Sequence, residues 1–238
     1  MCLILFAIQP DAHYELVIAT NRDEYYARPT RMAHFWADCP SLLAGKDLEM
    51  GGTWLGITRS GRFAAVTNFR ETPLVPPPPE SRGRLTLDFL NSDSDPLTYL
   101  LEIQKKGDLF RGFNLILGEP GRYFYFSNRN KEIVKLENGC YGLSNQLLDC
   151  DWPKVSQGRE KLDLLIKKDF NKEELFALLS EKGDSRPFSA SFIESAEYGT
   201  CASTVLIIEK EGRAVFEEKN FLANGVPSIT QSYEFEIN

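Results

Sequence analysis

The amino-acid sequence predicts an α+β fold, with strands at both ends of the chain and helices grouped between them. The chain has short apolar runs of β-branched and aromatic residues, turn signals between these runs, and segments with the apolar spacing of helices. This order favours two antiparallel sheets covered by helices on their outer faces, within a single domain spanning residues 1–238.

The strands are expected in hairpins, because turn-forming residues separate neighbouring runs by a few positions. The predicted pairs are residues 2–9 with 14–20, 53–58 with 62–69, 113–119 with 122–128, and 131–136 with 140–145. Three further strands, residues 203–210, 213–221 and 232–237, close the chain.

Helical spacing occurs in the middle of the chain. Residues 85–92 and 95–106 predict two short helices, and the second has Asp95 as a cap and Pro96 in its first turn. Residues 153–181 predict two more, separated at 169–171. Five prolines in residues 73–79 predict an extended surface loop, a candidate lid, before the first helix.

Composition excludes several classes of function. The net charge is -7 with a pI near 5.1, and no long basic run occurs, so we expect neither nucleic acid nor a strongly anionic partner. No apolar stretch approaches the roughly 20 residues of a membrane span. No basic residue precedes Arg22, so a secretory signal is not expected and the predicted location is cytoplasmic.

The five cysteines lack the spacing of zinc ligands, so we expect no metal site. Cys2 has a special position, because removal of Met1 would leave its own α-amine beside the thiol as a proton acceptor. The alternative is that Cys2 begins a buried strand. Cys39-Pro40 is either a plain loop or a weak haem-thiolate motif.

A polar block, Asn21-Arg22-Asp23-Glu24, follows the second strand. It is either a solvated turn or part of a site, since the first hairpin brings these residues back beside Cys2. A carboxylate there could hold an ammonium group, and a guanidinium could stabilise a thiolate.

Two asparagines, Asn68 and Asn145, come at the ends of apolar strands. An amide in such a place is either a loop cap or a donor to a developing oxyanion. Gly51-Gly52 are either a turn or a point where a ligand approaches the backbone. Aromatic residues near these motifs, Trp54 and Phe69 among them, have an ordinary core explanation as well.

Cys2 together with the blocks NRDE, GGTWLG, TNFR, RGFNLILG, YGLSN with WPKV, and STVLII resembles the NRDE family, also called the transport-and-Golgi-organisation family. The resemblance implies the N-terminal nucleophile (Ntn) hydrolase fold, a four-layer αββα sandwich. It is similar to the penicillin V acylase and bile salt hydrolase group, which cleaves linear amide bonds with an N-terminal cysteine.

By this resemblance Cys2 is the nucleophile, Asp23 orients its amine, Asn68 donates to the oxyanion and Asn145 orients the site. Expected substrate contacts are Asn21, Arg22, Glu24, Trp54, Phe69 and Arg70. Two departures stand out: Ala19 where the acylases carry an arginine, and Cys201 where the family commonly has one.

The sequence therefore leaves two functions open. The first is a cysteine hydrolase acting on a linear C–N amide bond of a small molecule, with no cofactor required. The second is a trafficking protein that holds haem or an acyl lipid in the same cleft without catalysis. The family resemblance implies links to haem trafficking and acyl-lipid homeostasis, and it names no substrate.

Overall fold

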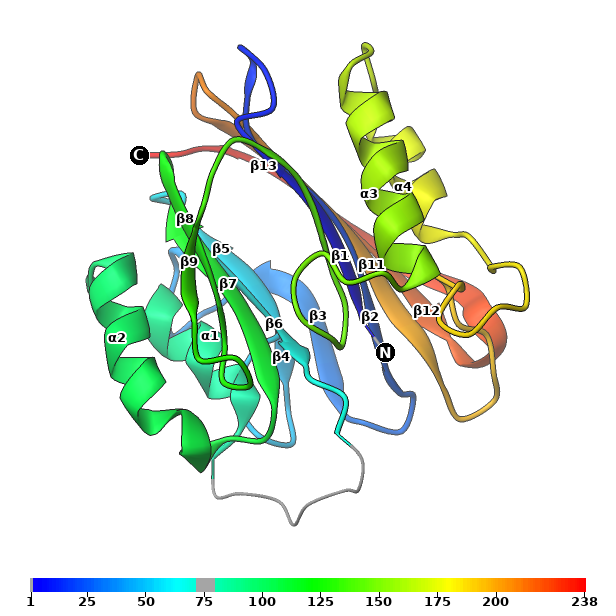
Figure 1. Cartoon of the computed structure of the whole chain (residues 1–238), viewed down its shortest axis with the longest axis horizontal. Helices are drawn as coiled ribbons and strands as arrows, with labels where there is room; N and C mark the ends of the chain where they lie inside the picture. Colours follow the sequence, from blue (N-terminus) through cyan, green and yellow to red (C-terminus); the bar gives the residue numbers. More distant parts are fainter. Residues whose placement is uncertain (1, 72–79) are drawn as a thin grey trace. The chain divides into compact units, whose positions relative to one another are not determined.

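The computed structural model describes residues 2–71 and 80–238 (Figure 1). The chain divides into two compact units, each with its own sheet and helices. Unit 1 comprises Met1–Arg28, Asn138–Ser144 and Leu148–Glu236, and unit 2 comprises Pro29–Glu137, Asn145–Leu147 and Ile237–Asn238. The single-domain prediction stays a prediction. Met1 and the predicted proline-rich lid, residues 73–79, lie outside the described residues.

Unit 1 contains a six-stranded antiparallel sheet in the order β10-β1-β2-β11-β12-β13. Its strands are β1 (Leu3–Ile8), β2 (Tyr14–Tyr25), β10 (Gly139–Leu143), β11 (Tyr198–Glu209), β12 (Arg213–Leu222) and β13 (Val226–Glu236). A 3₁₀ turn, η2 (Ala223–Gly225), joins the last two. Strand β1 is paired on both sides and buried along its whole length.

Two helices, α3 (Pro153–Ile166) and α4 (Lys172–Leu179), cover one face of this sheet (Figure 1). Pro153 starts α3 with its fixed φ, and Asn171 caps α4 in a capping box with Glu174. Apolar side chains of both helices pack on β1 and β2 in one cluster. Cys2, which lies just before β1, is therefore attached to a buried strand that is paired on both sides.

Unit 2 contains a seven-stranded antiparallel sheet whose strands follow chain order, β3 to β9. They are β3 (Thr30–Phe35), β4 (Leu42–Asp47), β5 (Leu55–Thr58), β6 (Phe63–Asn68), β7 (Phe113–Glu119), β8 (Arg122–Ser127) and β9 (Ile133–Leu136). The helices α1 (Arg82–Leu90) and α2 (Pro96–Lys106), with the 3₁₀ turn η1 (Gly107–Leu109), cover this sheet over an aromatic-rich core (Figure 1).

The α+β prediction with two antiparallel sheets is confirmed, as are the four helices and three of the four early hairpins. The predicted hairpin of residues 131–136 with 140–145 is wrong: β9 pairs with β8, whereas β10 pairs with β1. Gly142 lets β10 lie close to α3, because a Cβ there would lie 2.9 Å from Val155 of that helix. Turn chemistry at 137–139 could not reveal this choice of partner.

Two further differences concern the first third of the chain. Strands β3 and β4 were not predicted, since their polar and glycine content hides the alternating pattern. The polar block at residues 21–24 is not a solvated turn: β2 continues through it to Tyr25, and Asp23 pairs with Thr200 of β11. None of the helices formed by the described residues is long and apolar enough to cross a membrane.

Candidate functional site

Cys2 lies directly before β1, half-buried, within unit 1. Its Sγ is 4.0 Å from the backbone oxygen of Asp23, as the antiparallel register of β1 and β2 requires. The Cys2 carbonyl accepts hydrogen bonds from Ser144 Oγ at 2.6 Å and from Lys154 Nζ at 3.3 Å. The thiol-bearing residue is thus held through its backbone by groups from two other elements.

Asp23 is buried in β2, with 5% of its surface exposed. Its Oδ1 accepts a 2.7 Å hydrogen bond from Thr200 Oγ1, and Tyr198 Oη donates to its backbone oxygen at 3.2 Å. Burial raises the pKa of the Asp23 carboxyl, while the Lys154 cation and the Thr200 hydroxyl act to lower that pKa. Burial therefore disfavours the ionised form of this carboxyl, and the lysine cation and the threonine hydroxyl act against that effect.

Lys154 supplies that cation. The sequence did not lead us to predict a role for this residue in the site. Only 2% of it is exposed, because it occupies the buried face of α3 together with Gly158 and Leu162. Burial lowers the pKa of Lys154, and the charges of Asp23 and Cys2 act to raise it. A lysine at i, with apolar or small residues at i+4 and i+8, was the signal available in the sequence.

Arg22 and Cys201 are also neighbours in unit 1. Cys201 lies at a bulge of β11, where its Sγ is 3.5 Å from the backbone oxygens of Glu24 and Gly199. Burial raises the pKa of the Cys201 thiol, and the buried Arg22 acts to lower it. Cys201 thus lies within the electrostatic reach of Arg22, in the same unit as Cys2.

The Asn21 amide has a structural role. The residue is fully buried, and its Nδ2 donates to the carbonyls of Leu179 and Ser191 at 2.8 Å each. Its Oδ1 accepts a 2.6 Å hydrogen bond from Ser203 Oγ. The side chain thus ties α4 and the following loop to β11. Glu24 forms a loose ion pair with Arg28 at 3.9 Å.

Within unit 2, Asn68 and Asn145 are brought together. Asn68 ends β6 and is exposed, while Asn145 is buried and donates from Nδ2 to the Asn68 carbonyl at 2.7 Å. The Asn145 carbonyl in turn accepts from Arg70 N at 2.7 Å. The Asn145 amide therefore fixes the backbone of the predicted oxyanion donor.

The aromatic candidates of unit 2 differ in their surroundings. A Cβ added at Gly45 would come within 2.2 Å of the Trp54 ring, so the indole packs on the β4 backbone. Phe69 donates from its backbone to Gly112 O at 2.8 Å. Trp54 therefore has a packing role, whereas Phe69 and Arg70 leave the end of β6 beside Asn68.

Two other thiols are poor nucleophiles. Burial raises the pKa of Cys140 to about 11, with Asp163 adding to the effect, and burial also raises the pKa of Cys150. Burial likewise raises the pKa of the Tyr198 phenol, and the charges of Cys2 and Asp23 reinforce the rise. The phenol is therefore a hydrogen-bond donor beside Asp23 rather than a base.

Comparison with solved structures shows similarity to Ntn hydrolases. The mutant C2A conjugated bile acid hydrolase from Clostridium perfringens matches with a TM-score of 0.58 and 10% identity, over 100% of this chain and 93% of that one. The N-acylethanolamine-hydrolyzing acid amidase ortholog of Caenorhabditis elegans matches with a TM-score of 0.50 and 12% identity, over 87% and 92%. At these identities the likeness confirms the predicted fold.

Comparison of sequences identifies relatives over the whole chain. The bovine transport and Golgi organization protein 2 homolog is 34% identical and the mouse homolog 32% identical, each over 100% of this chain and 99% of the relative. The Drosophila melanogaster transport and Golgi organization protein 2 is 26% identical over 92% of each chain. The model of the family described as Transport and Golgi organisation 2 matches residues 1–223, so the chain belongs to that family.

Proposed function

We propose that this protein is an Ntn-type cysteine hydrolase that cleaves a linear amide bond of a small molecule. The observation that carries the proposal is the grouping of Cys2, Asp23 and Lys154 at the open end of a doubly paired strand. The likeness to two hydrolases, one of them an amidase for N-acylethanolamine, supports the class of reaction.

In the proposed reaction, removal of Met1 exposes the α-amine of Cys2, which accepts the thiol proton. The sulfur then forms a bond to the amide carbonyl carbon, the C–N bond breaks, and the leaving nitrogen takes the proton from the ammonium. Water next attacks the thioester, releasing the acid and restoring the thiol. Asp23 orients the ammonium form of the amine, because a buried carboxylate favours a neighbouring cation.

Lys154 has a positioning role in this scheme. Its Nζ holds the Cys2 carbonyl at 3.3 Å and its charge opposes the protonation of Asp23. The roles of Asn68 as oxyanion donor and Asn145 as orienting residue rest on the family resemblance and stay predictions. The predicted substrate contacts, which stay predictions, are Asn21, Arg22, Glu24, Trp54, Phe69 and Arg70.

The decisive experiment measures the mature N-terminus and the reactivity of Cys2 together. Intact mass is expected to show loss of Met1. An activated-ester probe is then expected to acylate Cys2, mapped by peptide mass, and an N-acylethanolamine serves as the first amide tested. Cys2→Ala should abolish both readouts, while Cys140→Ala is the matched control. Retained Met1, or equal turnover in Cys2→Ala, would contradict the proposal.

A second candidate function, binding of an acyl lipid without catalysis, is favoured by a cavity in unit 1. Its volume is about 370 Å³, and its lining includes Phe176, Phe192 and Phe221. Phe192 and Phe221 pack edge to face at 4.9 Å, and these rings offer apolar contact to an alkyl chain. The charged residues Glu173, Lys182, Glu194 and Lys219 also line the cavity, so its ligand would carry a polar group as well. The residues that line this cavity do not include Cys2, Asp23 or Lys154. Lipid binding here would therefore use a different site from catalysis, whereas the sequence led us to expect one shared cleft.

Titration with a fluorescent fatty acid tests this second candidate. Saturable binding that Phe192→Asp weakens tenfold, and that Cys2→Ala leaves unchanged, is expected if unit 1 holds an acyl chain. Titration with haem tests the other proposed ligand, because a saturable Soret shift reports haem binding directly.

The cytoplasmic location also stays a prediction.

A further inference from the structure

We infer that β13 is an interface through which two copies of this chain join their unit 1 sheets edge to edge, in an antiparallel dimer. This strand of 11 residues is the last of its sheet, and Figure 1 shows it in red next to β12. Among the strands that the structure describes, none pairs with its second side. The inference goes beyond the proposed hydrolysis and involves none of the residues grouped at Cys2.

The first part of β13 is exposed and uncharged. Residues 226–230 are all exposed, and no residue from Val226 to Tyr233 carries a charge. Val226 and Ile229 are 51% and 55% exposed, and Leu222 of β12, which pairs with Val226, is 58% exposed. A second strand beside β13 would remove part of this apolar surface from water, which favours association.

The backbone of this stretch offers hydrogen-bonding groups to a further strand. In a strand with one partner, alternate residues direct their N–H and C=O groups away from that partner. Pro227 lacks a donor, and the Ile229 carbonyl already accepts from Asn220 Nδ2 at 3.2 Å. Within residues 2–71 and 80–238, nothing outside the β12–β13 ladder hydrogen-bonds to Ser228 or Thr230. The open side of β13 can therefore form a second ladder of the same kind.

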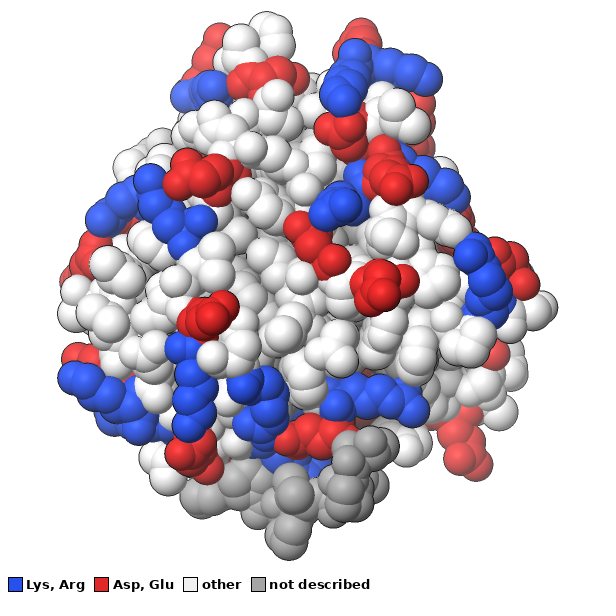
Figure 2. All heavy atoms as spheres, in the orientation of Figure 1, with Lys and Arg blue, Asp and Glu red and all other residues white. Residues whose placement is uncertain are grey.

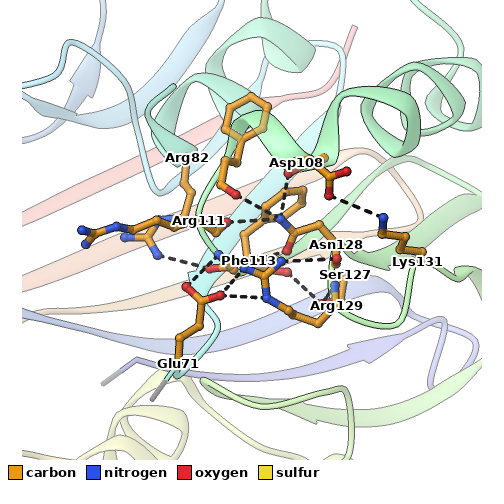
Figure 3. Close-up of polar contacts among 12 residues, drawn as sticks. Glu71, Arg82, Asp108, Arg111, Phe113, Ser127, Asn128, Arg129 and Lys131 are labelled. Carbon is orange, nitrogen blue, oxygen red and sulfur yellow. Dashed lines mark hydrogen bonds and ion pairs between the residues drawn. The ribbon is translucent and has the colours of Figure 1, made fainter. Parts of the chain in front are cut away.

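The other edges of the two described sheets are shorter, charged or covered. Strand β10 has five residues and lies close to α3. Strand β3 carries the exposed Arg31, and β9 has four residues, one of them the exposed Lys135. An ion pair of Lys131 with Asp108 at 3.4 Å also lies beside β9 (Figure 3). Soluble proteins use such features to prevent edge pairing, and the uncharged stretch of β13 lacks them.

The charge pattern of β13 fits a second copy of the same strand. An antiparallel register centred on Ile229 would set residues 226–232 of one copy against residues 232–226 of the other, with no like charges opposed. Glu234 lies outside this stretch and is paired with Arg213 of β12 at 2.7 Å. The two-fold axis would bring Ile229 of both copies together, so each exposed side chain would cover the other. Such closed two-fold pairs are the commonest soluble homo-oligomers.

The expected dimer is weak. The chain has a net charge of -7, which adds a repulsion between copies that salt screens. Figure 2 shows acidic and basic side chains interspersed over the drawn face, so no field of one sign dominates that face. One strand a side is also less than the roughly 20–30 residues of a standard interface, so we expect a dissociation constant on the order of 10 μM.

Sedimentation velocity of the full chain, from about 1 to 200 μM in physiological salt, tests the interface. The wild type is expected to dimerise reversibly. Ile229→Lys should weaken the dimer at least tenfold, because the two-fold pairing sets like charges opposite each other. The control is Val134→Lys, at an exposed β-branched residue of the β9 edge, which should change the dissociation constant less than twofold. Cys2→Ala should dimerise as the wild type does, so this test is independent of catalysis.

A pair of opposite charges tests the register. Ile229→Lys and Ile229→Glu should each be monomeric alone, whereas their equimolar mixture should form a heterodimer, because opposite charges would then meet at the two-fold axis. Failure of the mixture to dimerise would overturn the register centred on Ile229.

Three other results would overturn the inference itself. These are a monomeric wild type at the highest concentration, equal weakening of the dimer by Val134→Lys, and a monomeric wild type that binds an uncharged synthetic peptide through β13. The last result would assign this edge to a different protein. Circular dichroism melting of each variant verifies that the folded chain is being measured.

Discussion

The two units of this protein handle charge in opposite ways. In unit 1 a carboxylate and an ammonium group, Asp23 and Lys154, are both almost completely buried and lie close enough to shift each other's pKa. In unit 2 the guanidinium and carboxylate of Arg129 and Glu71 stay partly exposed, at 31% and 19% of their side chains.

This difference in burial determines how much each charge pair contributes to the stability of the fold. Buried charges in unit 1 are costly to separate, because each one left alone would carry its full desolvation penalty. The partly exposed pair in unit 2 is screened by water and contributes little to stability. Four substitutions test this contrast, from the largest expected effect to the smallest.

Lys154→Met should reduce the free energy of unfolding by about 3–5 kcal/mol, since it leaves Asp23 buried without its cation. The cation acts to lower the pKa of Asp23, so its removal raises that pKa further. A buried carboxyl with a raised pKa is destabilising above that pKa, and the loss should therefore shrink between pH 8 and pH 5. Urea unfolding at both pH values measures it.

The control for this variant is Lys161→Met, on the same helix, where the exposed lysine pairs with Glu181. Its effect should stay below about 1 kcal/mol. Equal losses for Lys154→Met and Lys161→Met would show that the buried cation has no special role in unit 1.

Asn21→Ala should cost about 2–3 kcal/mol, because Leu179 O, Ser191 O and Ser203 Oγ lose their partner inside the protein. Thermal unfolding followed by circular dichroism measures the loss. Asn130→Ala, at a half-exposed position of unit 2, is the control and should be close to neutral. A neutral Asn21→Ala would show that these buried hydrogen bonds contribute little to the stability of unit 1.

Gly112→Ala should destabilise the protein by about 1–3 kcal/mol, as overpacking does. The reason is steric, since the added methyl would meet Phe69, Arg129 and Glu71 at 3.0 Å or less. Gly107→Ala is the matched control, because its Cβ would meet Asn128 Cβ alone at 3.2 Å. Denaturant unfolding of both variants distinguishes the two positions.

Glu71→Gln should have the smallest effect on stability, about 1 kcal/mol or less. Because the folded pKa of Glu71 lies below its ordinary value, its contribution is present above that ordinary value and is lost as pH falls through the folded pKa. The gap between wild type and variant should therefore be present at pH 7 and vanish near pH 2. A gap that widens in acid would contradict this sign; Glu102→Gln, exposed on α2, is the control.

Most of the fold could be predicted because local patterns determine it. Asp95 and Pro96 start α2, and hairpin spacing joins β1 to β2 and β7 to β8. The partner of β10 could not be predicted, since β10 pairs with β1 at the start of the chain, and the turn at 137–139 carries no information about so distant a partner. Strands β3 and β4 were missed for a related reason: sheet pairing supports them where the sequence pattern is weak.

The candidate site divides in the same way. The proximity of Cys2 to Asp23 followed from hairpin register alone, because both residues lie at one end of the β1–β2 pair. Lys154 and Thr200 come from a helix and a strand far along the chain, so register with β1 could not reveal them. The role of Asn21 was missed because polar side chains near a motif give no sign of burial before the fold is known.

The interleaving of the two units has a consequence for the order in which the chain folds. Residues 29–137 supply almost all of unit 2 as one continuous stretch, and its strands pair in chain order, so this unit can form while synthesis proceeds. Strand β2 instead pairs with β11, which begins at Tyr198, more than 170 residues after the Tyr25 that it faces. The residues beside Cys2 are therefore among the last to be assembled, after loops of high closure entropy have been bridged.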